Sequence, residues 1–281
     1  MTAAVLYGGL SLLLLFALSG CEKVVDVDLN EANPALVIDA ILDAENNSLA
    51  ASVSLSGPYF DVVSTTPVTP DVIEVTLPDG ATEALVPATG RPGQPVDSSR
   101  AGQYVLRRRE PLPLGTYTMY VEYGGQAYTA SSTLRAPIVI QELLTEFAPE
   151  TIRNDEGYSV ELQYDDPGDE RNFYRIEHWV NGELQREPDD FIVIDDVLTD
   201  GTLARTPIFE QVFDVGDTVR VRLRHLDEPG YDYYRTLAET VGGGRGPGGA
   251  APGNPISNWE PEALGVFVAY SASTAEVVVV E

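Results

Sequence analysis

The sequence predicts an all-β protein: an immunoglobulin-like or transthyretin-like β-sandwich followed by a second β-rich domain with at most one short helix. Three features of the sequence support this prediction. Val, Thr and Tyr are frequent, apolar and polar residues alternate over short runs, and turn residues recur between these runs. Alternation with period two places one face of a strand in a core and the other in solvent. Short strands separated by regular turns are typical of sandwiches.

The first domain is expected over residues 35–136, with roughly seven strands, as an immunoglobulin-like sandwich requires. Two turns are explicit in its sequence: Pro78-Asp79-Gly80 closes one strand, and Gly124-Gly125 joins two alternating runs into a hairpin. The clearest strands are Leu36–Leu42, Ala51–Ser56, Val72–Leu77, Tyr104–Arg108, Thr116–Tyr123 and Gln126–Ser132.

The second domain is expected over residues 137–281. Asn181-Gly182 predicts a hairpin turn, and Pro229 to Ala238 predicts one short helix with proline near its start. Residues 242–253 are almost wholly Gly, Pro, Ala and Arg, which favours a flexible loop. The expected strands are Tyr158–Tyr164, Asn172–Val180, Phe191–Ile194, Ile208–Phe213, Thr218–Leu226 and a closing pair of strands, Leu264–Tyr270 and Ala275–Val280.

Cys21 is the only cysteine, and it follows the apolar stretch Leu10–Leu18 and the small residues Ser19-Gly20. This pattern indicates a lipoprotein signal over residues 1–20, which is cut before the cysteine so that its thiol can carry lipid. A membrane-spanning helix needs about 20 apolar residues, and this run is shorter. We therefore expect a lipid-anchored body joined to Cys21 by an acidic tether over residues 21–34.

The net charge of −27 excludes some partners. Neutralising phosphates needs a basic surface, so we expect no nucleic-acid partner. Electrostatic docking on anionic lipid headgroups is disfavoured for the same reason. Lys23 is the only lysine among 17 basic residues, and such an acid-rich, lysine-poor composition suits a protein that works in high salt, where screening relieves self-repulsion.

The sequence gives no catalytic residue. A nucleophile needs a base beside it, and only His178 and His225 are available. Both lie in strand-like patterns, which favours structural roles. The Gly-x-Ser-x-Gly motif of hydrolases does not occur, and no histidine pair or free cysteine supports a zinc site. We expect no cofactor other than the lipid on Cys21.

One acidic run could bind calcium. Asp165, Asp166, Asp169 and Glu170 supply oxygens that a hard cation prefers, and Asp195-Asp196 could add to them if the fold brings them close. The run lacks the spacing of an EF-hand loop, and in so acidic a chain such runs are expected on any solvated turn. Carboxylate pairs could also hydrolyse glycosides across a cleft, although the sequence selects no such pair.

Two groups of residues are candidates for an interaction surface. Arg220, Arg222 and Arg224 share one face of a predicted strand, where they could either dock a partner or pair with acids on neighbouring strands. The segment from Tyr231 to Trp259 is rich in aromatic residues, and we expect Trp259 to be exposed after the Gly-rich loop. Aromatic side chains serve either recognition or core packing. The candidates in this segment are Tyr231, Tyr233, Tyr234, Arg245 and Trp259.

Several short phrases occur in a characteristic order. After the cysteine and a short acidic stretch come Pro34-Ala35-Leu36-Val37-Ile38-Asp39-Ala40, the alternating strand Val219–Leu223, Tyr233-Tyr234, Asn254-Pro255 and Leu264-Gly265-Val266-Phe267-Val268-Ala269-Tyr270. In this order they resemble the Bacteroidota lipoproteins of domain of unknown function 4249. The resemblance spans the mature chain, and the Gly-rich insertion before Asn254 departs from it.

The resemblance implies a surface-exposed outer-membrane lipoprotein, because members of that family look like accessories of TonB-dependent transporters. It implies no catalytic residues. We therefore expect a non-enzymatic lipoprotein that binds an outer-membrane barrel of the TonB-dependent class or the cargo of that barrel. The alternatives are a stand-alone glycan- or calcium-binding surface module and, more remotely, a carboxylate-dependent hydrolase.

Overall fold

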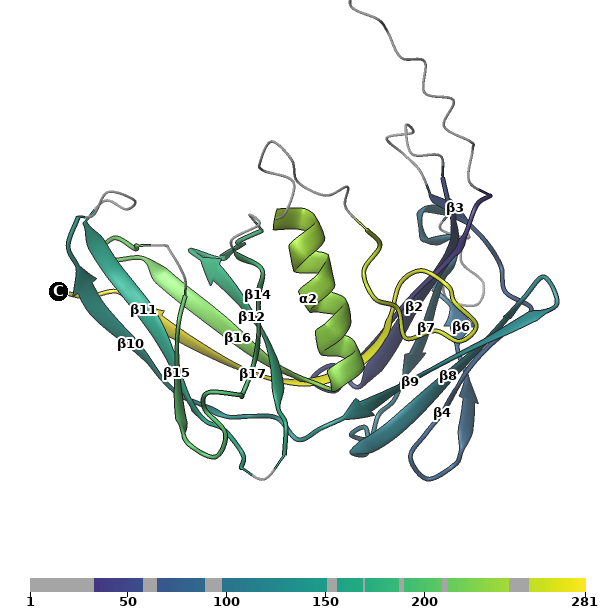
Figure 1. The fold of residues 1–281 in the computed structure, drawn as a ribbon, viewed down its shortest axis with the longest axis horizontal. Coiled ribbons are helices and arrows are strands. Elements are labelled where there is room, and N and C mark those ends of the chain that lie inside the picture. Colours follow the sequence, from purple (N-terminus) through teal and green to yellow (C-terminus); the bar gives the residue numbers. More distant parts are fainter. Residues whose placement is uncertain are drawn as a thin grey trace, which may run out of the picture. The chain divides into compact units, whose positions relative to one another are not determined.

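The computed structural model describes residues 33–57, 65–88, 98–150, 156–168, 170–186, 190–208, 212–242 and 253–281. Residues Pro34–Glu281 form one compact unit that consists mostly of β-strands (Figure 1). The predicted all-β class is confirmed. The expected signal over residues 1–20, nearly all of the expected tether over 21–34 and nearly all of the Gly-rich loop over 242–253 lie outside the described residues.

Two sheets pack face to face in the first half of this unit. The first contains β1 (Leu36–Asp43), β2 (Ser48–Ser56), β7 (Gln103–Arg107) and β6 (Val86–Pro87), with β3 (Thr65–Pro67) paired to β2. The second contains β5 (Thr82–Ala84), β4 (Val72–Thr76), β8 (Gly115–Tyr123) and β9 (Gln126–Leu134), in that order. A short 3-10 helix, η1, spans Ser98–Arg100. Alternate side chains of β1 and β8, including Ile38 and Met119, meet in the first core because each strand turns one face inward.

A second sandwich follows along the chain. One of its sheets contains β10 (Ile140–Ala148), β11 (Gly157–Asp165) and β15 (Leu203–Pro207). The facing strands are β12 (Phe173–Val180), β13 (Glu183–Leu184), β14 (Ile192–Asp195), β16 (Thr218–Leu226) and β17 (Phe267–Val278). Leu162 on β11, Ile176 on β12 and Val221 on β16 lie in the core between these sheets. Hydrophobic alternation therefore defines this second core as it does the first.

Strand β17 connects the two sandwiches. It runs parallel to β1 and antiparallel to β16, so both halves share a ten-stranded sheet whose main path is β13-β12-β16-β17-β1-β2-β7-β6 (Figure 1). The prediction of two closing strands was wrong. The small, mostly polar residues Ser271 to Thr274 interrupt the apolar pattern, but their backbone stays paired with β16. Phe267 and Ala269 also belong to the first core, so this segment is not confined to the second domain.

The helix α2 (Glu228–Gly242) confirms the predicted helix and extends it at both ends. Its residue Tyr234 packs with Val268 and Tyr270 of β17, whereas the alternate residues Phe267 and Ala269 face the first core. Because neighbouring residues of a strand point to opposite faces, α2 covers the face of the large sheet opposite the two smaller sheets. No helix in the described residues is long and apolar enough to cross a membrane.

The predicted hairpins at Gly124-Gly125 and Asn181-Gly182 are confirmed, with positive φ at all four turn residues. Strand β10 was missed because its apolar residues follow a helix-like spacing and its pairing contains a register shift near Ile140. Strand β15 was missed. Of the predicted strand Ile208–Phe213, residues 209–211 lie outside the described residues, and Phe213 makes an isolated bridge with Tyr158.

Candidate functional site

The arginine row of β16 lies on the face of the large sheet that also carries α2. Each guanidinium pairs with a carboxylate of the same chain: Arg220 with Glu276, Arg222 with Glu45 and Arg224 with Glu177, at N–O distances of 2.9, 3.4 and 2.9 Å. Arg220 and Glu276 are direct register partners on β16 and β17. The pairs of Arg220 and Arg224 therefore join neighbouring strands, as expected for cross-strand ion pairing, whereas Arg222 reaches Glu45 in the turn between β1 and β2.

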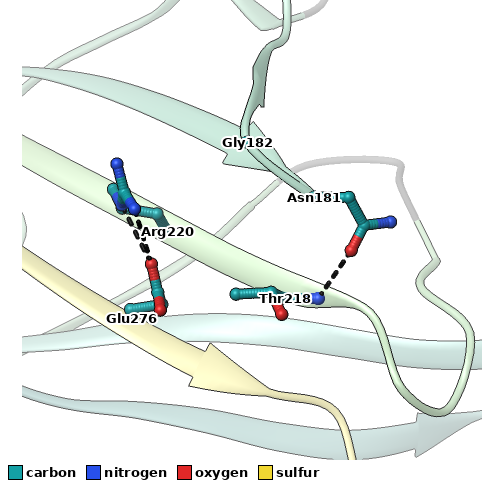
Figure 2. Close-up of a pocket in the computed structure, with 5 residues that line it drawn as sticks. All are labelled: Asn181, Gly182, Thr218, Arg220 and Glu276. Atoms are coloured by element: carbon teal, nitrogen blue, oxygen red, sulfur yellow. Dashed lines mark hydrogen bonds and ion pairs between the residues drawn. The ribbon is translucent and has the colours of Figure 1, made fainter.

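A hollow of about 340 Å³ lies at one end of this row and is drawn in Figure 2. The backbone N–H of Thr218 donates to the side-chain oxygen of Asn181 at 3.0 Å, and the guanidinium of Arg220 turns toward Glu276. Asn181 also donates to Asp217 at 2.8 Å. The polar groups that line the hollow are thus engaged with one another, which leaves Arg220 committed to an internal partner.

A second hollow, also of about 340 Å³, lies beside α2, with Arg175, Glu177 and Phe191 among its lining residues. The Arg175 guanidinium stacks 4.6 Å from the ring centre of Phe191 and 4.3 Å from that of Tyr234. Its Nη2 lies 3.5 Å from a carboxylate oxygen of Glu177. This arginine is therefore held between the helix and the sheet.

The aromatic residues of the segment Tyr231–Trp259 contribute mainly to packing. Trp259 is only 3 % exposed, so the prediction that it lies on the surface was wrong. Its Nε1 donates to the carbonyl of Ile38 at 2.9 Å, and the neighbouring Asn258 exchanges two hydrogen bonds with the backbone of Phe267. These bonds seat the indole in the first core, although the Gly-rich loop precedes it closely in sequence.

The three tyrosines of α2 pack against the sheet or one another. Tyr234 is buried, and the Tyr231 ring lies 4.8 Å from that of Phe173. Tyr233 is partly buried against Tyr234. Burial raises the pKa of the Tyr233 hydroxyl to about 12. The other candidates, Arg245, Asp169 and Cys21, lie outside the described residues.

The fold brings one residue of the acidic run close to Asp196. Carboxylate oxygens of Asp166, Asp196 and Asp200 all lie within 4.8 Å of one another. Asp165 and Glu170 have other partners: Asp165 accepts a hydrogen bond from Gln141, and Glu170 pairs with Arg135 at 2.8 Å. The fold thus selects Asp166 and Asp196 from the predicted calcium candidates and adds Asp200.

Hydrogen-bond donors already serve the two buried carboxylates of this cluster. Asp166 accepts from the hydroxyl of Tyr174 and from the backbone N–H of Gly201. Asp196 accepts from the backbone N–H of Asn172 at 2.7 Å and from its side-chain amide at 3.1 Å. Buried carboxylates need such donors. These hydrogen bonds tie the two turns to the protein interior.

Asn172 extends this network to a histidine. Its amide nitrogen donates to the carbonyls of Pro167 and Glu170, while its Oδ1 lies 3.1 Å from Nε2 of His225. Nδ1 of His225 donates to the carbonyl of Ala136 at 2.7 Å, because a carbonyl can only accept. Burial lowers the pKa of His225.

Both histidines thus occupy structural positions. The side chain of His178 is buried, with Nε2 lying 3.5 Å from a carboxylate oxygen of Asp190, and His225 links strand β16 to Asn172 and Ala136. Asn172 carried no distinguishing signal in the sequence, because its partners lie on three separate segments that only the fold brings together. Tyr174 also carried no such signal: the sequence predicted only that it lies in a strand, and not that it donates a hydrogen bond to Asp166.

The pH dependence of stability tests this network. Burial raises the pKa of Asp166 above 3.8, and the Asp196 carboxylate raises it further, whereas the Tyr174 hydroxyl lowers it. A raised pKa in the folded state means that stability is highest below the unfolded pKa and falls as pH rises through the folded pKa. Urea denaturation between pH 3.5 and pH 7 should therefore show wild type losing stability relative to Asp166→Asn, which stays neutral.

The matched control for this experiment is Asp165→Asn, which removes the same formal charge at an exposed position next in sequence. It corrects for the effect of net charge. The assigned environment of Asp166 is wrong if the difference in free energy of unfolding between wild type and Asp166→Asn shows the same dependence on pH as the difference between wild type and Asp165→Asn.

Comparison with known protein families identifies the family of this chain. No curated protein matches the chain. The family described as domain of unknown function DUF4249 matches residues 22–276, which cover both sandwiches, the helix and nearly all of β17. The phrases that suggested this resemblance, around Ile38 and Gly265, lie next to each other where Ile38 donates its N–H to Leu264. Because the match covers most of its 281 residues, the chain belongs to the DUF4249 family.

Proposed function

We propose that this protein is a non-enzymatic, lipid-anchored accessory that binds a TonB-dependent outer-membrane transporter, or the cargo of that transporter, at the outer face of a bacterial cell. One observation supports the non-enzymatic role most strongly: both histidines and the β16 arginines contact other groups of the same chain. Such a body is suited to presenting a fixed surface. The DUF4249 match and the lipoprotein-like residues before Cys21 support the location.

The hydrolase alternative finds less support. Glycosidases use two carboxylates that face each other across a cleft, about 5 to 9.5 Å apart. Asp166 and Asp196, a buried pair of the acidic cluster, are 5 % and 3 % exposed, and both carboxylates accept hydrogen bonds from the protein. The burial of both side chains restricts the access of a substrate to this pair.

Calorimetry distinguishes the accessory function from a stand-alone glycan- or calcium-binding module. Titrating the mature protein with Ca²⁺ and with a panel of sugars should give no binding heat, because an accessory needs a protein partner and not a small ligand. Saturable binding of Ca²⁺ that Asp196→Asn abolishes would favour the calcium-binding module. Saturable binding of a sugar would favour the glycan-binding module.

The anchor is tested by Cys21→Ser expressed in the native host. Metabolic labelling with a fatty acid should mark wild type and not the variant, and the variant should leave the envelope fraction. Even a single acyl chain gives only marginal membrane binding. A variant that carries no acyl chain should therefore be released almost completely. Unchanged labelling and retention of Cys21→Ser would contradict the anchor.

The partner and the orientation are tested with wild-type protein. Gently solubilised membranes should yield the protein together with an outer-membrane barrel, and protease added to intact cells should remove the body. Recovery as a free monomer would contradict the accessory role. Protection of the body from protease until the outer membrane is opened would place it on the periplasmic face instead.

A further inference from the structure

The turn between β14 and β15 exposes apolar side chains. Val197 is 67 % exposed and Leu198 is 96 % exposed, and Leu203 at the start of β15 is 44 % exposed. Isolated apolar residues on a surface are ordinary and need no explanation. Here two consecutive residues project from the tip of one turn, with a third close by in sequence. We name residues Asp196–Leu203 the apolar turn.

Its backbone is held in place by the buried network. The carbonyl of Asp196 accepts hydrogen bonds from the N–H groups of Thr199 and Asp200, at 2.8 and 2.9 Å. The carboxylate of Asp196 is fixed by Asn172 within the protein interior, and the N–H of Gly201 donates to Asp166. A turn fixed in this way loses little conformational entropy when it binds a partner.

A second turn braces the first. The N–H of Asp166 donates to the carbonyl of Thr202 at 3.0 Å. A Cβ added to Gly168 would stand 3.1 Å from the Cα of Gly201, so the two backbones are in close contact. Gly201 has φ +67°, a left-handed conformation that glycine adopts without strain. These contacts fix the backbone that carries Val197 and Leu198.

The charge around the apolar turn restricts what can cover it. Asp200 lies within the turn and is exposed, and exposed Asp165 is the register partner of Leu203, whereas Asp195, which precedes the turn, pairs with Arg171 at 3.6 Å. Anionic lipid headgroups would be repelled by these carboxylates. A second copy of this chain would bring another net charge of −27. Complementarity favours a surface whose apolar pocket is rimmed by basic side chains.

We propose that Val197 and Leu198 dock into an apolar pocket of a partner protein, with arginine or lysine side chains of that partner facing Asp165 and Asp200. This inference rests on the proposed accessory function and specifies where the partner binds. In protein interfaces a few side chains that fill pockets of the partner carry most of the binding energy, and we assign that role here to Val197 and Leu198.

Site-specific photo-crosslinking tests this surface in the full-length protein in its native host. A photoreactive phenylalanine analogue replaces Leu198 in one strain and Val215, which is 54 % exposed on another turn, in a second strain. We expect a protein adduct only from position 198, joined to a peptide that combines apolar and basic residues. The yield should fall several-fold in high salt. An adduct to lipid or to a second copy, equal adducts from both positions, or no adduct would overturn the proposal.

A second experiment separates this inference from the accessory function. Co-purification compares wild type, the double variant Val197→Ser with Leu198→Ser, and the control Val215→Ser, after thermal melting has shown that all three are folded. We expect the double variant to bind the partner about tenfold more weakly and the control to bind like wild type. If all three recover the barrel equally, the apolar turn is not the docking point although the accessory function stands. If wild type recovers no barrel, but position 198 still crosslinks to a basic pocket of another protein, the accessory function fails and the docking point stands.

Discussion

Replacing Gly265 with alanine is expected to lower the free energy of unfolding by about 4 kcal/mol, because it combines backbone strain with a steric clash. Gly265 has φ +89°, and a Cβ there would stand 2.4 Å from the carbonyl oxygen of Ile38 and 2.7 Å from Oδ1 of Asp39. The segment cannot move away freely. The N–H groups of Ile38 and Ala40 donate to the carbonyls on either side of Gly265, each at 2.8 Å.

Gly80→Ala is the matched control, because Gly80 has φ +87° but no atom within 4 Å of the position that a Cβ would take. This variant should lose about 1 kcal/mol, the cost of the left-handed conformation alone. Urea denaturation of both variants then separates the clash from the strain. Equal losses at the two positions would show that β1 can yield at Gly265, which would contradict the tight approach of these backbones.

Gly265 also explains why two distant phrases of the sequence share a family pattern. The phrase from Pro34 to Ala40 is the start of β1, and the phrase beginning at Leu264 leads into β17, which runs parallel to β1. The indole of Trp259, 221 positions from Ile38, donates to the same carbonyl that Gly265 approaches. The sequence showed these phrases in order, but not that they meet at one junction.

Strands with strict alternation could be predicted because each has a single way to place its apolar face. Thr218–Leu226 is the clearest example, since its valines and leucine face the second core and its arginines face the other side. Strand β10 could not be predicted in this way because only Leu143 and Ile138 just before it are buried in that region. Periodicity is informative only where burial is regular.

The candidate residues show the same limit. Composition identified Asp166 and Asp196 as acids that could converge, and the fold does bring them together. It could not identify Asn172, whose bonds reach Pro167 and Asp196 on different segments. Nor could it predict that Trp259 is buried, because the Gly-rich loop before it favoured an exposed position. Long-range contacts decide these positions, and one sequence does not display them.

Asp227→Ala is expected to cost about 3 kcal/mol of stability, the sum of a lost helix cap and unsatisfied buried donors. Asp227 precedes α2, and its Oδ1 accepts the N–H of Gly230 at 3.1 Å. Its Oδ2 accepts the hydroxyl of Ser132 at 2.9 Å and the N–H of Thr133 at 2.7 Å. One carboxylate therefore caps the helix and joins it to β9, about 95 residues away in sequence.

Asp227→Asn and Ser132→Ala complete the experiment. The amide keeps one oxygen for the helix cap or for β9 but not for both, so its loss of stability should be about half that of alanine. Because Ser132 bridges Asp227 to the N–H of Ala269 on β17, the double variant with Asp227→Ala should lose less than the sum of the two single losses. Additive losses would mean that the carboxylate and the hydroxyl act independently. In that case Asp227 would be only a helix cap, and the helix would be held on the sheet by its apolar contacts with Val268 and Tyr270 alone.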